Sequence, residues 1–238
     1  MIVNISPNRT HPRNHKIDTI TIHCFVGQVT AQRGCEVFAN SQRKASANYV
    51  VGYDGSVGIS CPEEDRSWCS SNAANDNRAI TIEVASDTVY PYKVTEQAMQ
   101  ALIDLLVDVC KRNDIKELLW RNDPSLIGQV DKQNMTLHRW FANKACPGDY
   151  LISKHPYIVE EVNKRLESRY SVRVGSYKRQ ANAIKMEKRL MSISINPVTT
   201  WDGTYYRVYA CRFRRLNDAN DYAKILAQNG IIGILCKE

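Results

Sequence analysis

The chain has 238 residues, of which 43% are hydrophobic and 24% charged; this is the balance of a folded globular protein and excludes a wholly disordered or collagen-like chain. No apolar run approaches the roughly 18 to 20 residues that span a bilayer, so we expect no insertion into a membrane. The first 14 residues lack the apolar core of a signal peptide, and we expect synthesis and folding in the cytoplasm. The eight cysteines form no C-x-x-C pair and are too dispersed for a disulfide scaffold.

Charge is distributed unevenly along the chain. Lys and Arg number 19 against 20 Asp and Glu over residues 1–167, and 13 against 5 over residues 168–238, so the net charges are −1 and +8. A neutral part followed by a strongly basic part predicts two modules with these bounds and with different tasks. The boundary is expected at Ser168 and Arg169, after a terminal helix in KHPYIVEEVNKRLESRY whose first turn accommodates Pro156.

Alternation and turn signals predict an α/β first module. IDTITIHC alternates in hydropathy and is expected to form a strand that ends at His23. SANYVVGYDGSVGI carries an Asp54-Gly55 turn between two apolar runs, which predicts a hairpin. RAITIEV predicts a further strand over 78–84, and Thr95 is expected to be the N-cap of a long amphipathic helix.

The second module contains an internal repeat at an offset of 36 residues. YSVRVGSYKRQANAIKMEKRL matches YRVYACRFRRLNDANDYAKIL, so that Tyr170 pairs with Tyr206. Each copy begins with strand-like alternation and continues as an amphipathic helix. Two further short strands, near 192–199 and 231–236, complete a β-α-β-β-α-β order, which is the split βαβ fold of the α+β class. We expect one sheet with both helices on one face and the other face open.

Three residues, His23, His138 and Cys146, suggest a metal site. His23 closes a strand, where the last side chain can face a cleft, while His138 and Cys146 lie eight positions apart in the loop-like segment TLHRWFANKACPGDY. Two imidazoles and one thiolate suit tetrahedral zinc with the fourth position left for water, which is the pattern of catalytic zinc. On residue types alone, the alternative is a structural, hydrogen-bonded His23 and an inert, buried Cys146.

The first module resembles the zinc-dependent N-acetylmuramoyl-L-alanine amidases that are related to the peptidoglycan recognition proteins. The elements TITIHC, SANYVVGYDGSV, DRSW, RAITIEVASD and HRWFANKACPGDY follow the family order over roughly the first 165 residues. The closing H-R-x(6)-C-P-G is the most specific of them. The resemblance implies an α/β fold with a mixed central sheet flanked by helices. It also implies hydrolysis of the amide that joins the lactyl group of muramic acid to L-alanine of the stem peptide.

The resemblance assigns roles by position. His23, His138 and Cys146 match the family's zinc ligands, which implies Zn²⁺ as the cofactor that binds the attacking water. Glu83 matches a catalytic carboxylate that takes the proton from this water and delivers it to the leaving amine. Lys144 matches a cation that supplies positive charge to the tetrahedral intermediate. The alternatives are a partly buried structural carboxylate at Glu83 and a solvated loop lysine at Lys144.

The sequence departs from the family pattern at two positions. Many members carry Tyr or His in the segment aligned with Ala47, and alanine has no group for catalysis, so more weight falls on Glu83. Many members also have His after the Trp of D-R-x-W, where this chain has Cys69. Cys69 either lines the cleft or packs inside. Trp68 either stacks on a sugar or peptide or belongs to the core.

The second module resembles a SPOR domain, a repeat-built module that binds peptidoglycan, especially glycan strands without stem peptides. YSVRVGSYKRQANA and YYRVYACRFRRLNDAND carry the resemblance. By alternation, Val172, Val174, Val208 and Ala210 face the helices. Arg173, Arg207 and Tyr209 then face outward, where a ring can stack on a pyranose and arginine can donate to its oxygens. The alternative is that these three are ordinary solvated residues of the sheet.

Together the two resemblances predict a cell-wall lytic enzyme of the phage or prophage endolysin kind, which acts on the wall after release from the cytoplasm. Its partners are the glycan strands and stem peptides of peptidoglycan. The second interpretation is a non-catalytic peptidoglycan recognition protein. A third gives the basic module to RNA, but RVYACRF does not match the aromatic motif K/R-G-F/Y-G/A-F-V-x-F/Y of RNA-recognition folds, so we expect no nucleic acid partner.

Overall fold

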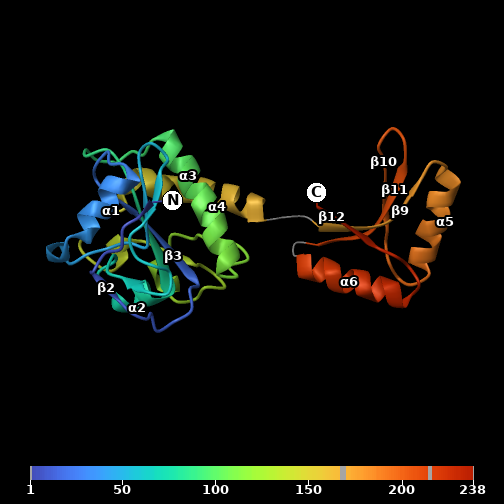
Figure 1. Cartoon of the computed structure of the whole chain (residues 1–238), viewed down its shortest axis with the longest axis horizontal. Helices are drawn as coiled ribbons and strands as arrows, with labels where there is room; N and C mark the ends of the chain where they lie inside the picture. The colour runs from blue at the N-terminus through green and yellow to red at the C-terminus, as the bar shows by residue number, and fades with distance from the viewer. Residues whose placement is uncertain (1, 167–169, 214–215, 238) are drawn as a thin grey trace. The chain divides into compact units, whose positions relative to one another are not determined.

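The computed structural model describes residues 2–166, 170–213 and 216–237 (Figure 1). The chain divides into two compact units, Met1–Leu166 and Glu167–Glu238. The boundary predicted at Ser168 and Arg169 lies outside the described residues. Each unit is considered by itself below.

A six-stranded mixed sheet forms the centre of the first unit, as the α/β prediction requires. Parallel pairing joins β4, β7, β3 and β8 side by side, and β4 pairs antiparallel with β5 in the predicted hairpin. The strands in sheet order are β1 (Ile2–Val3), β5 (Val57–Ile59), β4 (Tyr49–Val51), β7 (Ala79–Val84), β3 (Thr19–Cys24) and β8 (Met135–Thr136), and a separate pair is formed by β2 (Arg9–Thr10) and β6 (Arg66–Ser67).

Helices flank this sheet. They are α1 (Ala31–Ala39), α2 (Ala73–Arg78), α3 (Glu96–Arg112) and α4 (Gly148–Leu166), with short 3-10 helices η1 (Ser41–Arg43), η2 (Pro124–Leu126) and η3 (His138–Trp140). Thr95 caps α3 as predicted, since its hydroxyl accepts the amide hydrogen of Ala98 at 3.1 Å. No helix among the described residues has the length and hydropathy needed to cross a membrane.

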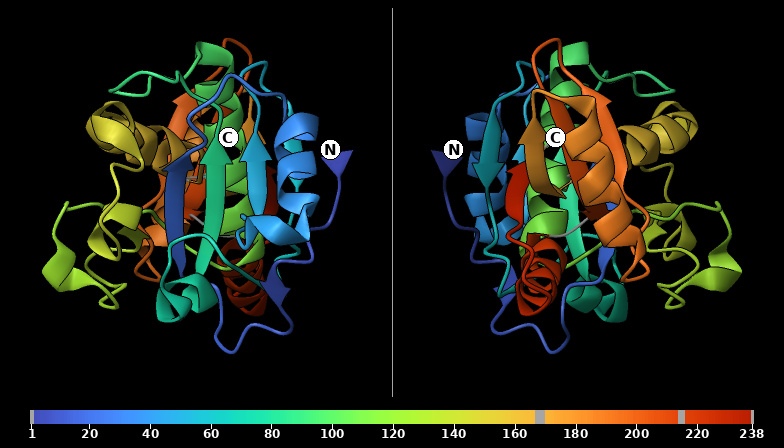
Figure 2. Two further views of the ribbon diagram at one scale, coloured as in Figure 1. Left: turned by 90° about the vertical axis from the view of Figure 1, so that its left-hand side faces the viewer. Right: turned by 90° about the vertical axis from the view of Figure 1, so that its right-hand side faces the viewer.

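The two faces of the central sheet differ in chemistry because β3 and β7 alternate in step. Their isoleucines are fully buried against α3 and α4 in the main core (Ile20, Ile22, Ile80 and Ile82). The opposite face carries Thr21, His23, Thr81 and Glu83, and Thr21 is hydrogen-bonded to Thr136 of β8 at 2.7 Å. Figure 2 shows these strands face-on, with α3 behind them in the left view. Alternation therefore places His23 and Glu83 on the polar face.

Helix α4 corrects the predicted position of Pro156. The proline lies inside α4 rather than in its first turn, because the helix already begins at Gly148. Leu151 and His155 are buried on the same face as Ile158, so the buried stripe extends upstream of the proline. The prediction treated proline as a start signal, whereas packing against the core determines where this helix begins.

The second unit has the predicted β-α-β-β-α-β order. Its elements are β9 (Tyr170–Tyr177), α5 (Gln180–Met191), β10 (Val198–Trp201), β11 (Tyr206–Phe213), α6 (Leu216–Gln228) and β12 (Ile234–Lys237). The antiparallel sheet runs β10-β11-β9-β12. Val172, Val174, Val208 and Ala210 are buried with Ala183 and Leu190 of α5 and Ala219 and Leu226 of α6, which confirms that both helices cover one face.

Two short strands of the second unit lie later than predicted. β10 begins at Val198 rather than near residue 192, because α5 continues to Met191 and is followed by a turn in which Ser194 has a φ of 61°. β12 begins at Ile234, because Ile231 is buried in the core before the strand starts. In both cases the apolar residues that suggested a strand, Ile193 and Ile195 before β10 and Ile231 before β12, lie in the loop before the strand and pack on the core.

Candidate active site

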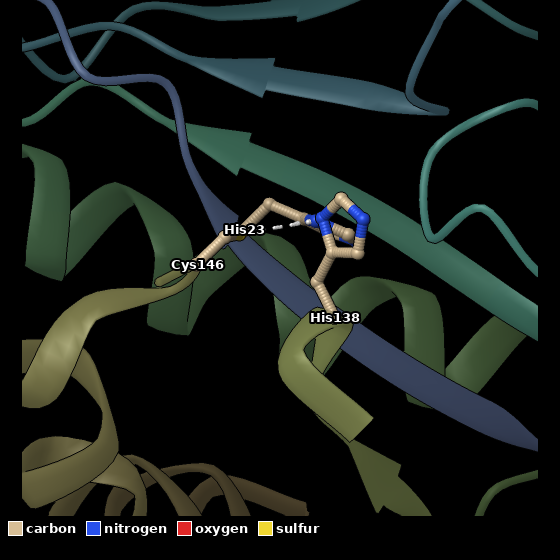
Figure 3. A group of neighbouring side chains, drawn as sticks. All are labelled: His23, His138 and Cys146. Carbon is tan, nitrogen blue, oxygen red and sulfur yellow. Dashed lines mark hydrogen bonds between the residues drawn. The ribbon is translucent and has the colours of Figure 1, made fainter. Parts of the chain in front are cut away.

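Two segments that are distant in the sequence, β3 with His23 and the segment that carries both His138 and Cys146, meet at one place (Figure 3). One ligand atom of each residue lies within 4.8 Å of those of the other two. The Cys146 Sγ is 3.3 Å from the His23 Nδ1, and the two imidazole centroids are 5.0 Å apart. This spacing leaves room for one cation among two nitrogens and a sulfur.

The strand register places Glu83 beside His23. The strand β3 ends at Cys24, one residue later than predicted, and its penultimate residue His23 is the direct partner of Glu83 on β7. Side chains of paired residues in a sheet point to the same face. His23, Cys69 and Glu83 also offer ligand atoms within 4.8 Å of one another. The predicted carboxylate is therefore adjacent to the cluster of His23, His138 and Cys146.

Backbone and side-chain bonds tie the His138 and Cys146 segments together. The Arg139 amide donates to the Cys146 carbonyl at 3.2 Å, and the Arg139 guanidinium donates to the Ala145 carbonyl at 2.7 Å. The same guanidinium is paired with Asp149 in the first turn of α4 at 3.0 Å. The residue that follows His138 thus holds the loop that carries Cys146.

Both imidazoles are held in the neutral form. Burial, with a smaller contribution from His138, lowers the pKa of His23 to about 3. Burial and the Lys144 charge lower the pKa of His138. The buried Nε2 of His23 has no hydrogen-bond partner among the described residues. Neutral imidazoles with a free nitrogen are what metal ligation requires.

The Cys146 thiol lies against a second thiol. The hydrogen bond with Cys24 and burial raise the pKa of Cys146, and Glu83 adds to the effect. Cys24, the last residue of β3, therefore influences Cys146 directly. Without a cation this sulfur stays protonated, and a bound cation would favour the thiolate.

Glu83 has the environment of a proton-transfer group. Burial is the main cause that raises the pKa of Glu83 to about 8. Its Oε2 is buried with no partner among the described residues, while its Oε1 is 3.8 Å from the Cys69 Sγ. A carboxyl group with a pKa near neutrality can both accept and deliver a proton.

The remaining residues singled out in the first unit take separate positions. Lys144 is exposed, and its side chain has no ion pair within the described ranges. Cys69 is partly buried: it packs against the apolar cluster that contains Ala47, and its Sγ is 3.8 Å from the Glu83 Oε1. Ala47 is fully buried among apolar neighbours. The Trp68 indole donates to the Thr10 hydroxyl at 2.9 Å, so its N–H is already used within the unit.

In the second unit, the three predicted glycan contacts lie on adjacent strands. Arg173 of β9 and Tyr209 of β11 are direct cross-strand partners and are partly exposed. Arg207 is also partly exposed, but its guanidinium is hydrogen-bonded to the Asp202 carboxylate. Arg173 and Tyr209 therefore make a pair, whereas Arg207 already has an internal acceptor.

The raised pKa of Glu83 predicts a pH-dependent stability of the zinc-free protein. The folded-state pKa of about 8 exceeds the ordinary value of 4.5, so the folded state binds the proton more tightly. This stabilisation is complete below about pH 4.5 and is lost as the pH rises toward 8. We expect the free energy of unfolding of Glu83→Gln, relative to wild type, to increase from pH 5 to pH 8. Urea unfolding of chelator-treated protein at three pH values measures it, and a constant difference would contradict the assigned environment.

Two residues near the site were missed in the sequence. Ser71 contacts the His138 Nε2 at 3.3 Å, and the buried Asp76 accepts the backbone amides of Cys69 and Ser70 at 3.1 Å each. Their only signal was proximity to the D-R-x-W segment, because serine and aspartate near a helix start are common caps.

Comparisons with known proteins identify the family of each part of the chain. Residues 13–149 match the family model of N-acetylmuramoyl-L-alanine amidase, and residues 166–234 match that of the SPOR domain. No curated protein sequence matches the chain. Among solved structures, PlyL has a TM-score of 0.52 and 14% identity, with 68% of this chain and 96% of that chain covered. A mutant endolysin from Bacillus subtilis has a TM-score of 0.50 and 16% identity, with 68% and 97% covered.

At these identities, the similarity to the solved structures establishes only the fold of the first unit and says nothing of its activity. The family model goes further, because it spans more than half of the chain and includes the segments that carry His23, Glu83, His138 and Cys146. The chain therefore belongs to the N-acetylmuramoyl-L-alanine amidase family and carries a SPOR domain after its amidase region.

Proposed function

We propose that this protein is a zinc-dependent lytic enzyme that hydrolyses the amide between the lactyl group of N-acetylmuramic acid and L-alanine in peptidoglycan. The observation that carries the proposal is the convergence of His23, His138 and Cys146, whose ligand atoms lie within 4.8 Å of one another. The family match supports the choice of substrate.

The residues present fit zinc. Two neutral imidazoles and a thiol form a nitrogen and sulfur donor set, and three protein ligands leave a fourth tetrahedral position for water. The unpartnered Nε2 of His23 and Oε2 of Glu83 are buried polar atoms that the described protein groups leave unsatisfied, as is typical of sites completed by a bound species. Zinc bound there would lower the pKa of water to near 7 and polarise the scissile carbonyl.

Glu83 is proposed as the proton-transfer residue. Glu83 is the cross-strand partner of His23 on the same sheet face, so its carboxylate would lie close to a water bound at the cluster. Glu83 accepts the proton of that water and delivers it to the departing amine of L-alanine. A nearby cation would stabilise the carboxylate and so oppose the burial that raises its pKa.

Lys144 is proposed to stabilise negative charge on the substrate oxygen. It is exposed, and its charge reaches His138, whose pKa it helps to lower. An exposed ammonium near His138 could stabilise the developing oxyanion.

Mass analysis of digested peptidoglycan tests the proposal. Wild type should release stem peptides with a new L-alanine amino terminus and leave intact glycan. Cys146→Ala should release none. Cleavage within the glycan or between peptide residues would contradict the assigned bond, and zinc binding without any release would favour a recognition protein instead.

The second unit is proposed to hold the enzyme on the wall through its open sheet face. The unit has a net basic composition, and its helices cover only the opposite face. Tyr209 offers a ring for a pyranose, and its neighbour Arg173 offers donors for hydroxyl and carbonyl oxygens. Arg207 lies two residues before Tyr209 in the same strand, and its guanidinium is paired with the Asp202 carboxylate.

Truncation after Leu166 is expected to leave a folded amidase that attaches weakly to the wall. The first unit has a core of its own, in which α3 and α4 pack on its sheet. Soluble muropeptide should be cut at an unchanged rate, while the fraction that pellets with purified walls should fall. Unchanged pelleting would contradict the role given to the second unit.

Replacing both Arg173 and Tyr209 by alanine is expected to weaken wall binding by roughly 10-fold or more, because each ring or charged contact contributes about 1 kcal/mol. Pelleting with walls stripped of stem peptides measures it. The matched control is Lys188→Ala, which also removes one positive charge, but from the helix α5. An equal loss of wall binding in this control would mean that net charge alone explains the effect.

A further inference from the structure

A strained serine stands beside one of the candidate zinc ligands. Ser71 has a φ of 61°, in the left-handed region that non-glycine residues rarely adopt. Such a conformation persists only where the surrounding structure imposes it, and it is concentrated at functional sites. Glycine would fit this backbone without strain, but it would bring no hydroxyl group.

Asp76 holds the backbone of the two residues that precede Ser71. Its side chain is 1% exposed, and its carboxylate accepts the amide of Cys69 and the amide of Ser70, each at 3.1 Å. The Ser70 hydroxyl donates to the Asn72 carbonyl at 3.3 Å, and the Asn72 side chain caps α2. The loop that presents Ser71 is therefore fixed to the start of α2.

The Ser71 hydroxyl contacts the Nε2 nitrogen of His138. Its Oγ lies 3.3 Å from the His138 Nε2, and within the described chain it is the sole hydrogen-bond partner of that imidazole. Figure 3 shows that the ring turns one nitrogen toward His23 and the other away. Since Nε2 is occupied by Ser71, Nδ1 is the nitrogen left for the cluster with His23 and Cys146.

We propose that Ser71 is a positioning residue: its hydroxyl accepts the Nε2 proton of His138 and so presents the unprotonated Nδ1 to the metal. The inference rests on the proposed zinc function. Metal-bound histidines commonly donate their second N–H to an acceptor that fixes tautomer and ring orientation. Ser71 would supply this acceptor, and the Asp76-bound loop would hold it in place.

The first test reads the tautomer without metal. A long-range proton–nitrogen correlation spectrum of the zinc-free full chain should show His138 as the Nε2-protonated tautomer, with its signals assigned by their absence in His138→Gln. Ser71→Ala and Ser71→Gly should both shift the population toward the Nδ1-protonated form. An Nδ1-protonated His138 in wild type, or an unchanged tautomer in both variants, would overturn the proposal.

The second test measures zinc affinity by chelator competition. Loss of such an acceptor weakens metal binding by roughly 10- to 100-fold, and we expect about 10-fold because Ser71 is exposed and water can partly replace it. Ser71→Gly suits the backbone and keeps the test valid should Ser71→Ala fold poorly. Ser194→Ala is the matched control, because Ser194 also has a φ of 61° but lies in the second unit.

The zinc affinities distinguish a failure of the role of Ser71 from a failure of the proposed zinc function. A 10-fold loss in both Ser71 variants, with Ser194→Ala unchanged, supports the positioning role. Affinities within twofold of wild type in both Ser71 variants overturn it. If wild type binds no zinc, or Cys146→Ala binds it equally well, the proposed function is contradicted. The tautomer of His138 in the zinc-free protein then still tests whether Ser71 accepts the Nε2 proton.

Discussion

Cys146→Ala is expected to abolish zinc binding and hydrolysis together. The residue supplies the only thiol of the cluster with His23 and His138, and two imidazoles alone make a much weaker site. Losing the metal removes several kcal/mol of charge stabilisation in the transition state, or about a thousandfold or more in kcat. Zinc content after dialysis and the release of stem peptides measure both effects.

The control for this variant is Cys236→Ala, which removes another partly buried free thiol from the second unit. It should retain one zinc per chain and full activity. In Cys146→Ala we expect zinc and activity to be lost together. A variant that lacks zinc but still cleaves walls would exclude the metal from the mechanism.

Glu83→Gln should separate metal binding from catalysis. The amide keeps the shape of the side chain next to His23 but cannot carry a proton between water and the leaving amine. Loss of a general acid–base group costs about 10²- to 10⁴-fold in rate, so we expect a zinc-loaded, folded and nearly inactive protein.

Glu63→Gln is the matched control for Glu83→Gln. Glu63 is a partly buried carboxylate of the same unit, paired with Arg112 rather than with the cluster. This variant should lose stability but keep its turnover. Full activity in Glu83→Gln would remove Glu83 from the mechanism and leave Lys144 as the only proposed group outside the metal ligands.

Much of the fold could be predicted because the local sequence of β3 and β7 has the hydropathy alternation of strands. Their alternation separates the buried isoleucines from Thr21, His23, Thr81 and Glu83, and it follows from the period of a strand. The parallel register that pairs His23 with Glu83 was not predictable, since it depends on how the helices pack on the sheet. The Pro156 interpretation failed for the same reason, because a local start signal was overridden by the buried stripe of α4.

The candidate site shows a similar division. The convergence of His23, His138 and Cys146 was expected from the family resemblance, because residue types alone left structural alternatives open. The role of Ser71 was not predicted, because the sequence around this serine does not indicate a φ of 61° or a contact with a residue 67 positions away. Such contacts arise from loop conformation, which tertiary hydrogen bonds such as those of Asp76 determine.

Zinc-edge X-ray absorption of the full chain tests the central claim most directly, because it reports the atoms that surround the ion. We expect one sulfur at about 2.3 Å, two imidazole nitrogens at about 2.0 to 2.1 Å and one further light atom around the zinc. A shell without sulfur would contradict the assignment of Cys146. A shell with two sulfurs would also contradict it, because Cys24 or Cys69 would then fill the position reserved for water.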